Sequence, residues 1–110
     1  MWIHLIRKET IEDYVTKNAR SRPSFFSWLA ILKFADWYNP QDIKLTYGSA
    51  DILGFGYNRV VFNIGGNRYR MICKYHFGQV QVHLFLCWIG THDEYNYLCQ
   101  EKKQFTVTDY

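Results

Sequence analysis

The feature that most constrains the fold of this chain is Gly65-Gly66, a glycine pair between two segments in which polar and apolar residues alternate. Such a pair favours a two-residue β-hairpin turn, because glycine takes positive φ angles without a steric cost. In that register Ile64 pairs with Asn67, and Arg59 pairs with Ile72. Side chains alternate between the two faces of a strand. We therefore expect the hairpin to sort its residues into an apolar face and a basic face.

The predicted strands, over 59–64, 67–77 and 79–89, divide clearly between these two faces. The apolar face carries Val60, Phe62, Ile64, Tyr69, Met71 and Cys73, and then Val80, Val82, Leu84, Leu86 and Trp88 from the third strand. The basic face carries Arg59, Asn63, Arg68, Arg70, Lys74 and His76. Val61, Ile72 and Phe85 interrupt this face, which suggests a partly enclosed cleft. From Ile52 to His92 the chain has no Asp or Glu, so we expect a polyanionic partner.

Periodicity before and after these strands completes the predicted fold class, which is α+β. A strand over Trp2–Ile6 precedes a helix capped by Thr10, whose apolar positions include Ile11, Tyr14 and Val15. A second helix begins near Pro23 and ends at Asn39-Pro40. Its expected apolar stripe consists of Phe26, Leu29, Ala30, Phe34 and Trp37. We expect a long irregular connection over 39–57 and a short helical turn over 93–98. One domain over residues 1–110 is predicted, with two helices and a mainly antiparallel three-stranded sheet.

The third strand ends in Gly90-Thr91-His92, and this end should lie near the Gly65–Arg68 turn. His92 and Tyr95 would then border the same cleft as Arg68 and Arg70. Three readings of this cluster are open. The arginines and the Thr-His turn are a solvated sheet face with a helix cap, or the face binds RNA without catalysis, or the cluster is catalytic.

Composition excludes several other classes of protein. The three cysteines, Cys73, Cys87 and Cys99, lack metal-ligand spacing and are odd in number, which favours free thiols in a reducing compartment. The chain has no run of the roughly 20 apolar residues that a membrane span needs, and its N-terminal apolar run is too short for a signal peptide. We expect a cytoplasmic protein with no membrane contact, no metal site and no cofactor.

Two segments, Asn63–Lys74 and Ile89–Tyr95, resemble the HigB branch of the RelE-like ribonuclease toxins of bacterial type II toxin–antitoxin systems. Members of that branch tend to carry an NxGGNxYRLxxK-like hairpin and a VGTHxEYD-like end. The resemblance spans nearly the whole chain, with Met71 where leucine is commoner and Asn96 where aspartate is common. It implies a strand, two helices and a curled antiparallel sheet.

The resemblance also implies a function: a ribosome-dependent mRNA endonuclease that inhibits translation. Its expected partners are messenger RNA on the ribosome and a cognate, DNA-binding, HigA-like antitoxin that neutralises it. Carried over by position, Arg70 meets the scissile phosphate, with Lys74 and Arg68 beside it. His92 and Tyr95 match the family's Thr-His-x-x-Tyr end.

Metal-free cleavage of RNA, with the substrate's 2′-OH as nucleophile, fits these residue types. Arg70 and Lys74 would stabilise the charge that develops on the phosphate. His92 would act as general base or acid, because imidazole changes charge near neutral pH, and Tyr95 would stack on a base or orient a proton transfer. Further expected RNA contacts are Arg68, Arg59, Asn63, Asn67 and His76. The alternatives are a non-catalytic RNA-binding domain and a protein-interaction module.

Overall fold

A computed structural model describes residues 1–110 as a five-stranded sheet with helices on both faces. The strand order is β1-β5-β4-β3-β2. The strands are β1 (Trp2–Ile6), β2 (Asp51–Leu53), β3 (Arg59–Ile64), β4 (Tyr69–Phe77) and β5 (Gln81–Thr91). β1 runs parallel to β5, and all other neighbours are antiparallel. The α+β class is confirmed, but the prediction of three strands in the sheet is wrong, since β1 and β2 extend both of its edges.

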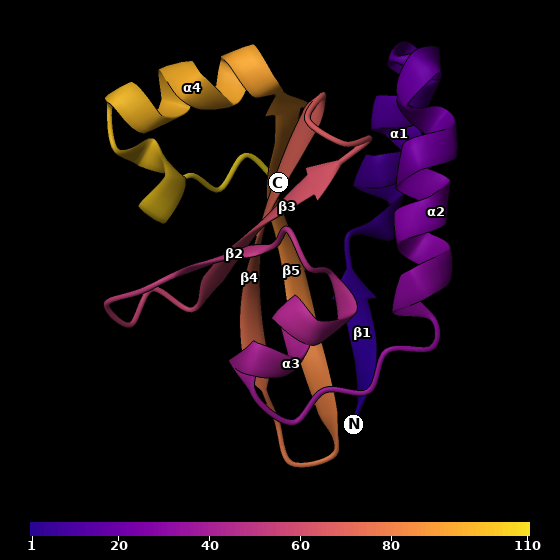
Figure 1. Cartoon of the computed structure of the whole chain (residues 1–110), viewed down its shortest axis with the longest axis vertical. Coiled ribbons are helices and arrows are strands. Elements are labelled where there is room, and N and C mark those ends of the chain that lie inside the picture. Colours follow the sequence, from indigo (N-terminus) through magenta and orange to yellow (C-terminus); the bar gives the residue numbers. More distant parts are fainter.

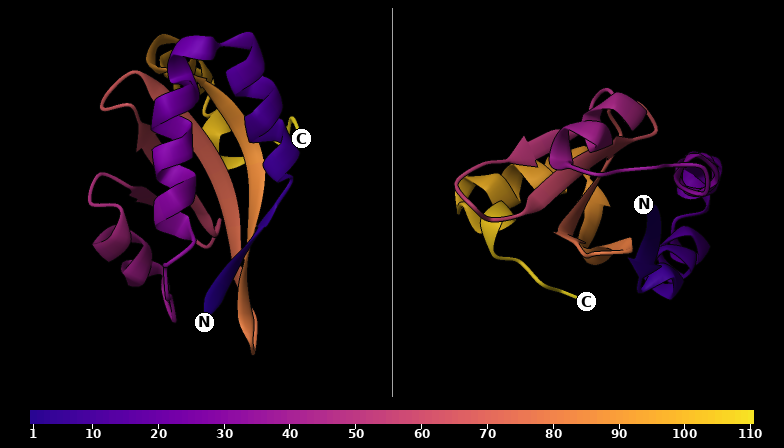
Figure 2. Two further views of the ribbon diagram at one scale, coloured as in Figure 1. Left: turned by 90° about the vertical axis from the view of Figure 1, so that its right-hand side faces the viewer. Right: turned by 90° about the horizontal axis from the view of Figure 1, so that it is seen from below.

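Four α-helices surround the sheet, where two were predicted. They are α1 (Lys8–Lys17), α2 (Arg22–Leu32), α3 (Pro40–Thr46) and α4 (His92–Gln100). Short 3-10 turns follow α1 and α4 at Ala19–Ser21 and Lys103–Phe105. Figures 1 and 2 show α1 and α2 on one side of the sheet, and α4 with the C-terminal segment on the other. None of these helices is both long enough and apolar enough to cross a lipid bilayer.

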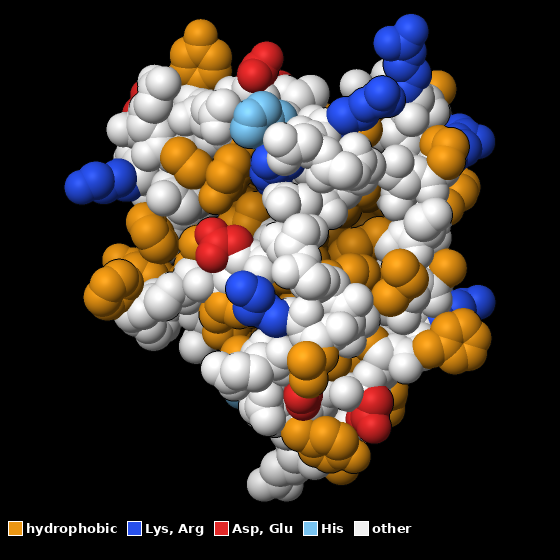
Figure 3. Space-filling view, in the orientation of Figure 1, with side chains coloured by type: hydrophobic (Ala, Val, Ile, Leu, Met, Phe, Trp, Pro, Cys, Tyr) orange, Lys and Arg blue, Asp and Glu red, His pale blue; other side chains and the backbone are white.

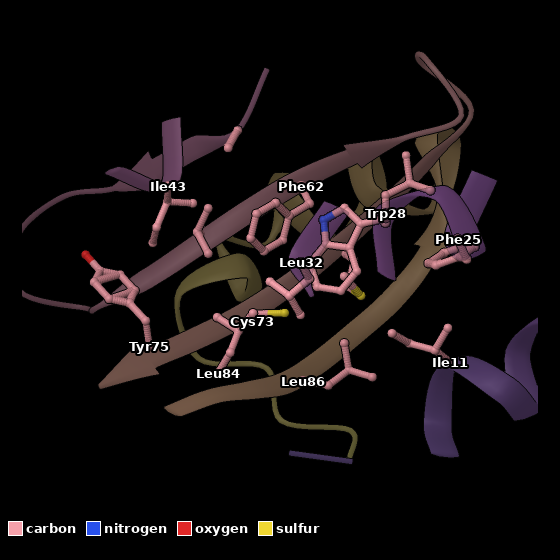
Figure 4. Close-up of a cluster of buried hydrophobic side chains, with 14 of the residues drawn as sticks. Ile11, Phe25, Trp28, Leu32, Ile43, Phe62, Cys73, Tyr75, Leu84 and Leu86 are labelled. Carbon is pink, nitrogen blue, oxygen red and sulfur yellow. The ribbon is translucent and has the colours of Figure 1, made fainter. Parts of the chain in front are cut away.

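The main core lies between the sheet and the helices α1, α2 and α3 (Figure 4). The expected apolar stripe of α2 is wrong in phase, because the buried positions are Phe25, Trp28 and Leu32. Phe26 and Phe34 are 45% and 88% exposed. Ten of the thirteen residues from Phe25 to Trp37 are apolar, so several helical faces qualified, and contact with the sheet selected one of them.

The ends of the first two helices also differ from prediction. The first begins at Lys8, one residue after Arg7, which takes a left-handed conformation with φ 72°, and Thr10 therefore lies inside the helix. Ile11 and Val15 are buried as expected. The second helix ends at Leu32, and irregular chain carries Trp37 into the core, where its indole Nε1 donates to Thr46 Oγ1 at 2.8 Å.

The expected irregular connection over 39–57 contains both α3 and β2. A capping box begins α3: the Asn39 side chain accepts from the Asp42 amide, and the Asp42 carboxylate accepts from the Asn39 amide. Pro40 occupies the first helical turn, where its missing amide costs nothing. This Asn-Pro-x-Asp signal is visible in the sequence, and Ile43 anchors the helix to the core with no exposed surface.

The hairpin has a longer turn than predicted. Ile64 pairs with Tyr69, and Arg59 pairs with Lys74, so residues 65–68 form a four-residue connection. Both glycines have φ +68°, as expected from their sequence. Because the register differs from the predicted one by two residues, every side chain stays on its predicted face. Arg68, however, leaves the strand and lies in the exposed turn.

A β-bulge corrects the predicted position of Trp88. Ile72 pairs with Trp88 but Cys73 pairs with Leu86, so Cys87 is an extra residue on β5. A bulge shifts the alternation of the following side chains by one position. Trp88 therefore leaves the main core and packs on the opposite face, beside Ile72.

That opposite face, predicted to be basic, holds a second apolar cluster. Its buried members are Leu53, Val61, Ile72, Cys87 and Trp88, and it is covered by Tyr95, Leu98, Phe105 and Val107. These four residues come from α4 and the segment after it, so the C-terminal part of the chain covers the upper part of this face. The three cysteines are free, with Cys73 and Cys87 buried, and burial raises the pKa of both thiols.

Candidate active site

The start of α4 is fixed beside the β3–β4 turn. Thr91 caps the helix: its hydroxyl accepts from the Glu94 amide at 3.2 Å, and the Glu94 carboxylate accepts from the Thr91 amide at 2.7 Å. The His92 amide donates to the Arg68 carbonyl at 2.9 Å. A histidine and a basic side chain lie in contact in this upper part of Figure 3. The cap and the strand ladder together hold His92 at the top of the sheet.

Arg70 lies where the start of α4 meets the β3–β4 turn, a place that we call the Arg70 corner. The residue is almost buried there, with 7% of its surface exposed. Its Nη1 donates to the carbonyls of Asn67 at 3.3 Å and Tyr69 at 3.2 Å, and its Nη2 donates to Asn67 Oδ1 at 2.8 Å. Neither ion pair of the structure includes this residue. The guanidinium is thus oriented by neutral acceptors and keeps its positive charge uncompensated, which suits it to an oxyanion.

The second partner of Arg70 Nη2 is Nδ1 of His92, at 3.1 Å. A guanidinium only donates hydrogen bonds, so Nδ1 accepts and the proton of the neutral imidazole lies on Nε2. On its outer side, Nε2 lies 3.5 Å from Asn96 Nδ2, and a 180° turn of that amide presents its oxygen to the Nε2 proton. The lone pair of this imidazole is therefore directed at Arg70, and its N–H is directed outward.

Tyr95 forms an aromatic wall beside the pair. Its ring centroid lies 6.0 Å from Arg70 Cζ and 6.1 Å from the ring of Trp88. Burial is the main cause that raises the pKa of Tyr95, with further contributions from Cys99. The phenol therefore keeps its proton at neutral pH, and the ring offers its π-face to the guanidinium.

Arg59 lies on the same face but is only 5% exposed. Its Nη1 donates to the carbonyls of Gln104 at 3.3 Å and Val107 at 2.7 Å. The guanidinium that was expected to contact RNA therefore holds the C-terminal segment against the sheet.

Lys74 and His76 lie apart from Arg70, although all three side chains project from the same face of β4. Four residues along a strand correspond to about 13 Å, and the apolar cluster around Ile72 lies between. Lys74 and His76 line a separate surface hollow of about 450 Å³ with Arg7 and Phe85. The single cleft expected from the sequence is therefore two patches.

Comparison with known proteins decides the family. Residues 21–98 match the model of the HigB toxin family, described as the RelE-like toxic component of a toxin–antitoxin system. The chain belongs to the HigB toxin family. A relative within it is the mRNA interferase HigB of Escherichia coli O6:H1 (strain CFT073), which is 25% identical over 96 residues, covering 87% of this chain and 91% of the relative. The resemblance inferred from the hairpin and the Gly-Thr-His end is confirmed.

The matched segment of this HigB-family chain contains the corner residues, α2, α3, and Lys74, His76 and Phe85 of the second patch, whereas Arg7 lies outside it. In the corner the structure joins Arg70, His92, Tyr95 and Asn67. Asn63 stands opposite Arg70 on β3, and its amide lies 3.4 Å from the Ser49 carbonyl. The functional roles of all these residues stay predictions.

Two neighbours in the corner were not predicted as site residues. Trp88 reaches Tyr95 only because of the bulge, which nothing in the sequence signals. Asn96 lies one helical turn after His92, and that i, i+4 spacing is visible once α4 is known to start at His92. No group of three or more His, Cys, Asp or Glu side chains is arranged to hold a metal ion.

Proposed function

We propose that this chain is a toxin that cleaves messenger RNA on the ribosome; its E. coli relative is named an mRNA interferase. The observation that carries the proposal is the corner itself. A buried guanidinium without a carboxylate partner is bonded to an imidazole at the exposed start of a helix. One group suits a phosphate and the other suits proton transfer, as RNA cleavage requires.

The proposed reaction uses the 2′-OH of the RNA as nucleophile. The 2′-oxygen gives its proton to a base and forms a bond to the adjacent phosphorus while the bond from phosphorus to the 5′-oxygen breaks. The 5′-oxygen takes a proton from solvent, which leaves a cyclic phosphate and a 5′-hydroxyl. Arg70 stabilises the extra negative charge on the phosphate oxygens. One preorganised donor of this kind contributes about 10²–10³ in rate.

His92 is the proposed general base, and the Arg70 bond explains how it becomes available. A phosphate oxygen is a stronger acceptor than a neutral imidazole. When RNA binds, the Nη2 hydrogen bond passes from Nδ1 to the phosphate, and the freed lone pair accepts the 2′-OH proton. Tyr95, with its proton retained, stacks against the guanidinium and bounds the site.

The family description supports the remaining parts of the proposal. A toxic component of a toxin–antitoxin system acts with an antitoxin, and we propose a HigA-like, DNA-binding protein that neutralises the toxin in the cytoplasm. We also propose that cleavage depends on the ribosome, as the resemblance implies, because the ribosome would present single-stranded message to the toxin in a fixed geometry.

The test is induction of the wild-type chain and His92→Ala in cells, with transcript 5′ ends mapped before growth stops. We expect new internal ends within translated messages for the wild type and none for His92→Ala. Tyr97→Ala is the matched control, because Tyr97 lies on the same helix and is 72% exposed. It should cleave as the wild type does.

Three outcomes would change this proposal. If His92→Ala still cleaves messages, the nuclease proposal stands, and the general base is another residue. RNA binding without cleavage by folded wild-type protein would favour a non-catalytic RNA-binding domain. Cleavage of purified RNA without ribosomes at the same rate would remove the ribosome from the mechanism.

A further inference from the structure

On the sheet face opposite α1 and α2, the lower half carries a group of imidazole and aromatic side chains that no helix covers. It carries His4 on β1, His83 and Phe85 on β5 and His76 on β4, and we call these four residues the histidine platform. Strand pairing brings them together, because His4 and His76 both stand opposite His83. Figures 1 and 2 show that α4 and the C-terminal segment cover the upper part of this face and leave its lower part, at the β4–β5 hairpin, free of helices.

The rings of the platform form a continuous row. The His83 centroid lies 5.8 Å from His4, 6.0 Å from His76 and 6.3 Å from Phe85. The His76 and Phe85 rings are inclined to His83 by only 30° and 28°, whereas His4 meets His83 edge-on at 62°. Trp2, 61% exposed, extends the row at 6.2 Å from His4. Flat rings held side by side on a rigid sheet offer π-faces on which nucleobases stack.

The charges around the platform favour a polyanion. Lys74 and Arg7 border it, in the hollow of about 450 Å³ that His76 and Phe85 also line. Neither cation forms an ion pair, since the two ion pairs of the structure lie elsewhere. On the lower half of this face, the residues of β1, β4 and β5 include no Asp or Glu: they are Trp2, His4, Ile6, Lys74, His76, Gln81, His83 and Phe85. Asp51, an acidic strand residue on the same face, lies on β2 at the other edge of the sheet. A protein-binding face would more often mix its charges or be apolar.

We propose that the histidine platform binds single-stranded RNA, stacking unpaired bases on its rings while Lys74 and Arg7 contact the phosphates. The proposal rests on the proposed function, because it makes the platform a second contact for the RNA that enters the Arg70 corner. Both lie on one face of β4, about 13 Å apart along the strand. The platform then contributes affinity for the flank of the cleaved message, and the corner performs the reaction.

The experiment measures binding separately from cleavage. The probe is a fluorescent single-stranded RNA methylated at every 2′-oxygen, which lacks the nucleophile, and anisotropy titrations give its affinity for the full chain. His83→Ala and Phe85→Ala should each weaken binding at least about fivefold, as loss of one stacked base does. Phe85→Tyr keeps the ring and should bind as the wild type does. Phe34→Ala, which removes an 88% exposed ring after α2, is the matched control.

Three results would contradict the proposal that the platform binds single-stranded RNA. Unchanged affinity in His83→Ala and Phe85→Ala, with native unfolding midpoints, would show that the rings do not stack on RNA. Equal weakening of duplex RNA binding by the same two substitutions would show that the rings do not act by stacking on bases, because paired bases cannot stack on them. If the antitoxin no longer neutralises these two variants while their RNA affinity is intact, the platform is a protein contact.

Failure of the platform and failure of the proposed function are distinguishable. If the wild type cleaves messages in cells and the platform variants bind RNA normally, only the platform proposal falls. If wild-type protein binds the probe through the platform but cleaves no message, the nuclease proposal falls and the RNA surface stands.

Discussion

The Arg70 corner and the histidine platform lie on one face of the sheet, yet they hold their cations in opposite ways. In the corner, Arg70 is buried and bonded to three neighbours, Asn67, Tyr69 and His92. On the platform, Lys74 is exposed and has no ion-pair partner. A buried, oriented cation is preorganised for a transition state, whereas an exposed one mainly adds affinity that salt screens. The comparison indicates that a shared face does not mean a shared role.

The C-terminal segment creates this difference. It packs Phe105 and Val107 over the middle of the face, and Arg59 binds two of its carbonyls. The backbone amide of Asp109 then donates to the Cys87 carbonyl at 2.9 Å, which holds the segment along β5. The corner is enclosed on this side, and the platform begins where the segment ends.

The largest expected difference between the two regions lies in their cations, Arg70 and Lys74. Arg70→Ala should lower single-turnover cleavage of ribosome-bound message by about 10²–10³, because it removes the donor to the phosphate. Lys74→Ala should lower it by less than about tenfold, as expected for one exposed phosphate contact. Arg70→Lys keeps the charge without the planar fork and should fall between them. Equal losses in Arg70→Ala and Lys74→Ala would mean that the two patches act as one site.

A smaller effect should follow from releasing the segment that separates the two regions. Arg59→Ala leaves the carbonyls of Gln104 and Val107 without their donor, which should lower the free energy of unfolding by about 1–3 kcal/mol. Urea denaturation measures it, with Arg20→Ala as a control at an exposed arginine. An unchanged midpoint for Arg59→Ala would show that the segment is held by its apolar contacts alone.

The smallest effect is expected at the helix cap that positions His92. Thr91→Ala removes the acceptor of the Glu94 amide and should cost about 0.5–2 kcal/mol of stability. Cleavage should fall with it, since His92 loses its fixed place beside Arg70, whereas binding to the platform should not change. Thr91→Ser restores the cap and should restore both quantities. If Thr91→Ser cleaves as poorly as Thr91→Ala, the threonine acts through its methyl group instead.

Local signals in the sequence predicted the central hairpin and the approach of its turn to His92. Gly65-Gly66 fixes the turn region, and alternation fixes the faces, so an error of two residues in register moved no side chain across the sheet. The capping signals at Asn39-Pro40 and Thr91–Glu94 were equally local, and the helices that they begin were open to prediction. The buried stripe of α2 could not be predicted in the same way, because its apolar residues fit more than one helical face.

What the sequence determined by itself is therefore which residues share a face, since a strand repeats every two residues and needs no partner for that pattern. It also determined the family, through two short segments that the comparisons bear out. Only the tertiary structure decided which residues on that face meet. The bulge at Cys87 and the docking of the C-terminal segment depend on contacts between distant parts of the chain. Those contacts buried Arg59 and left Lys74 with the histidines, whereas strand pairing and the cap at Thr91 placed His92 beside Arg70.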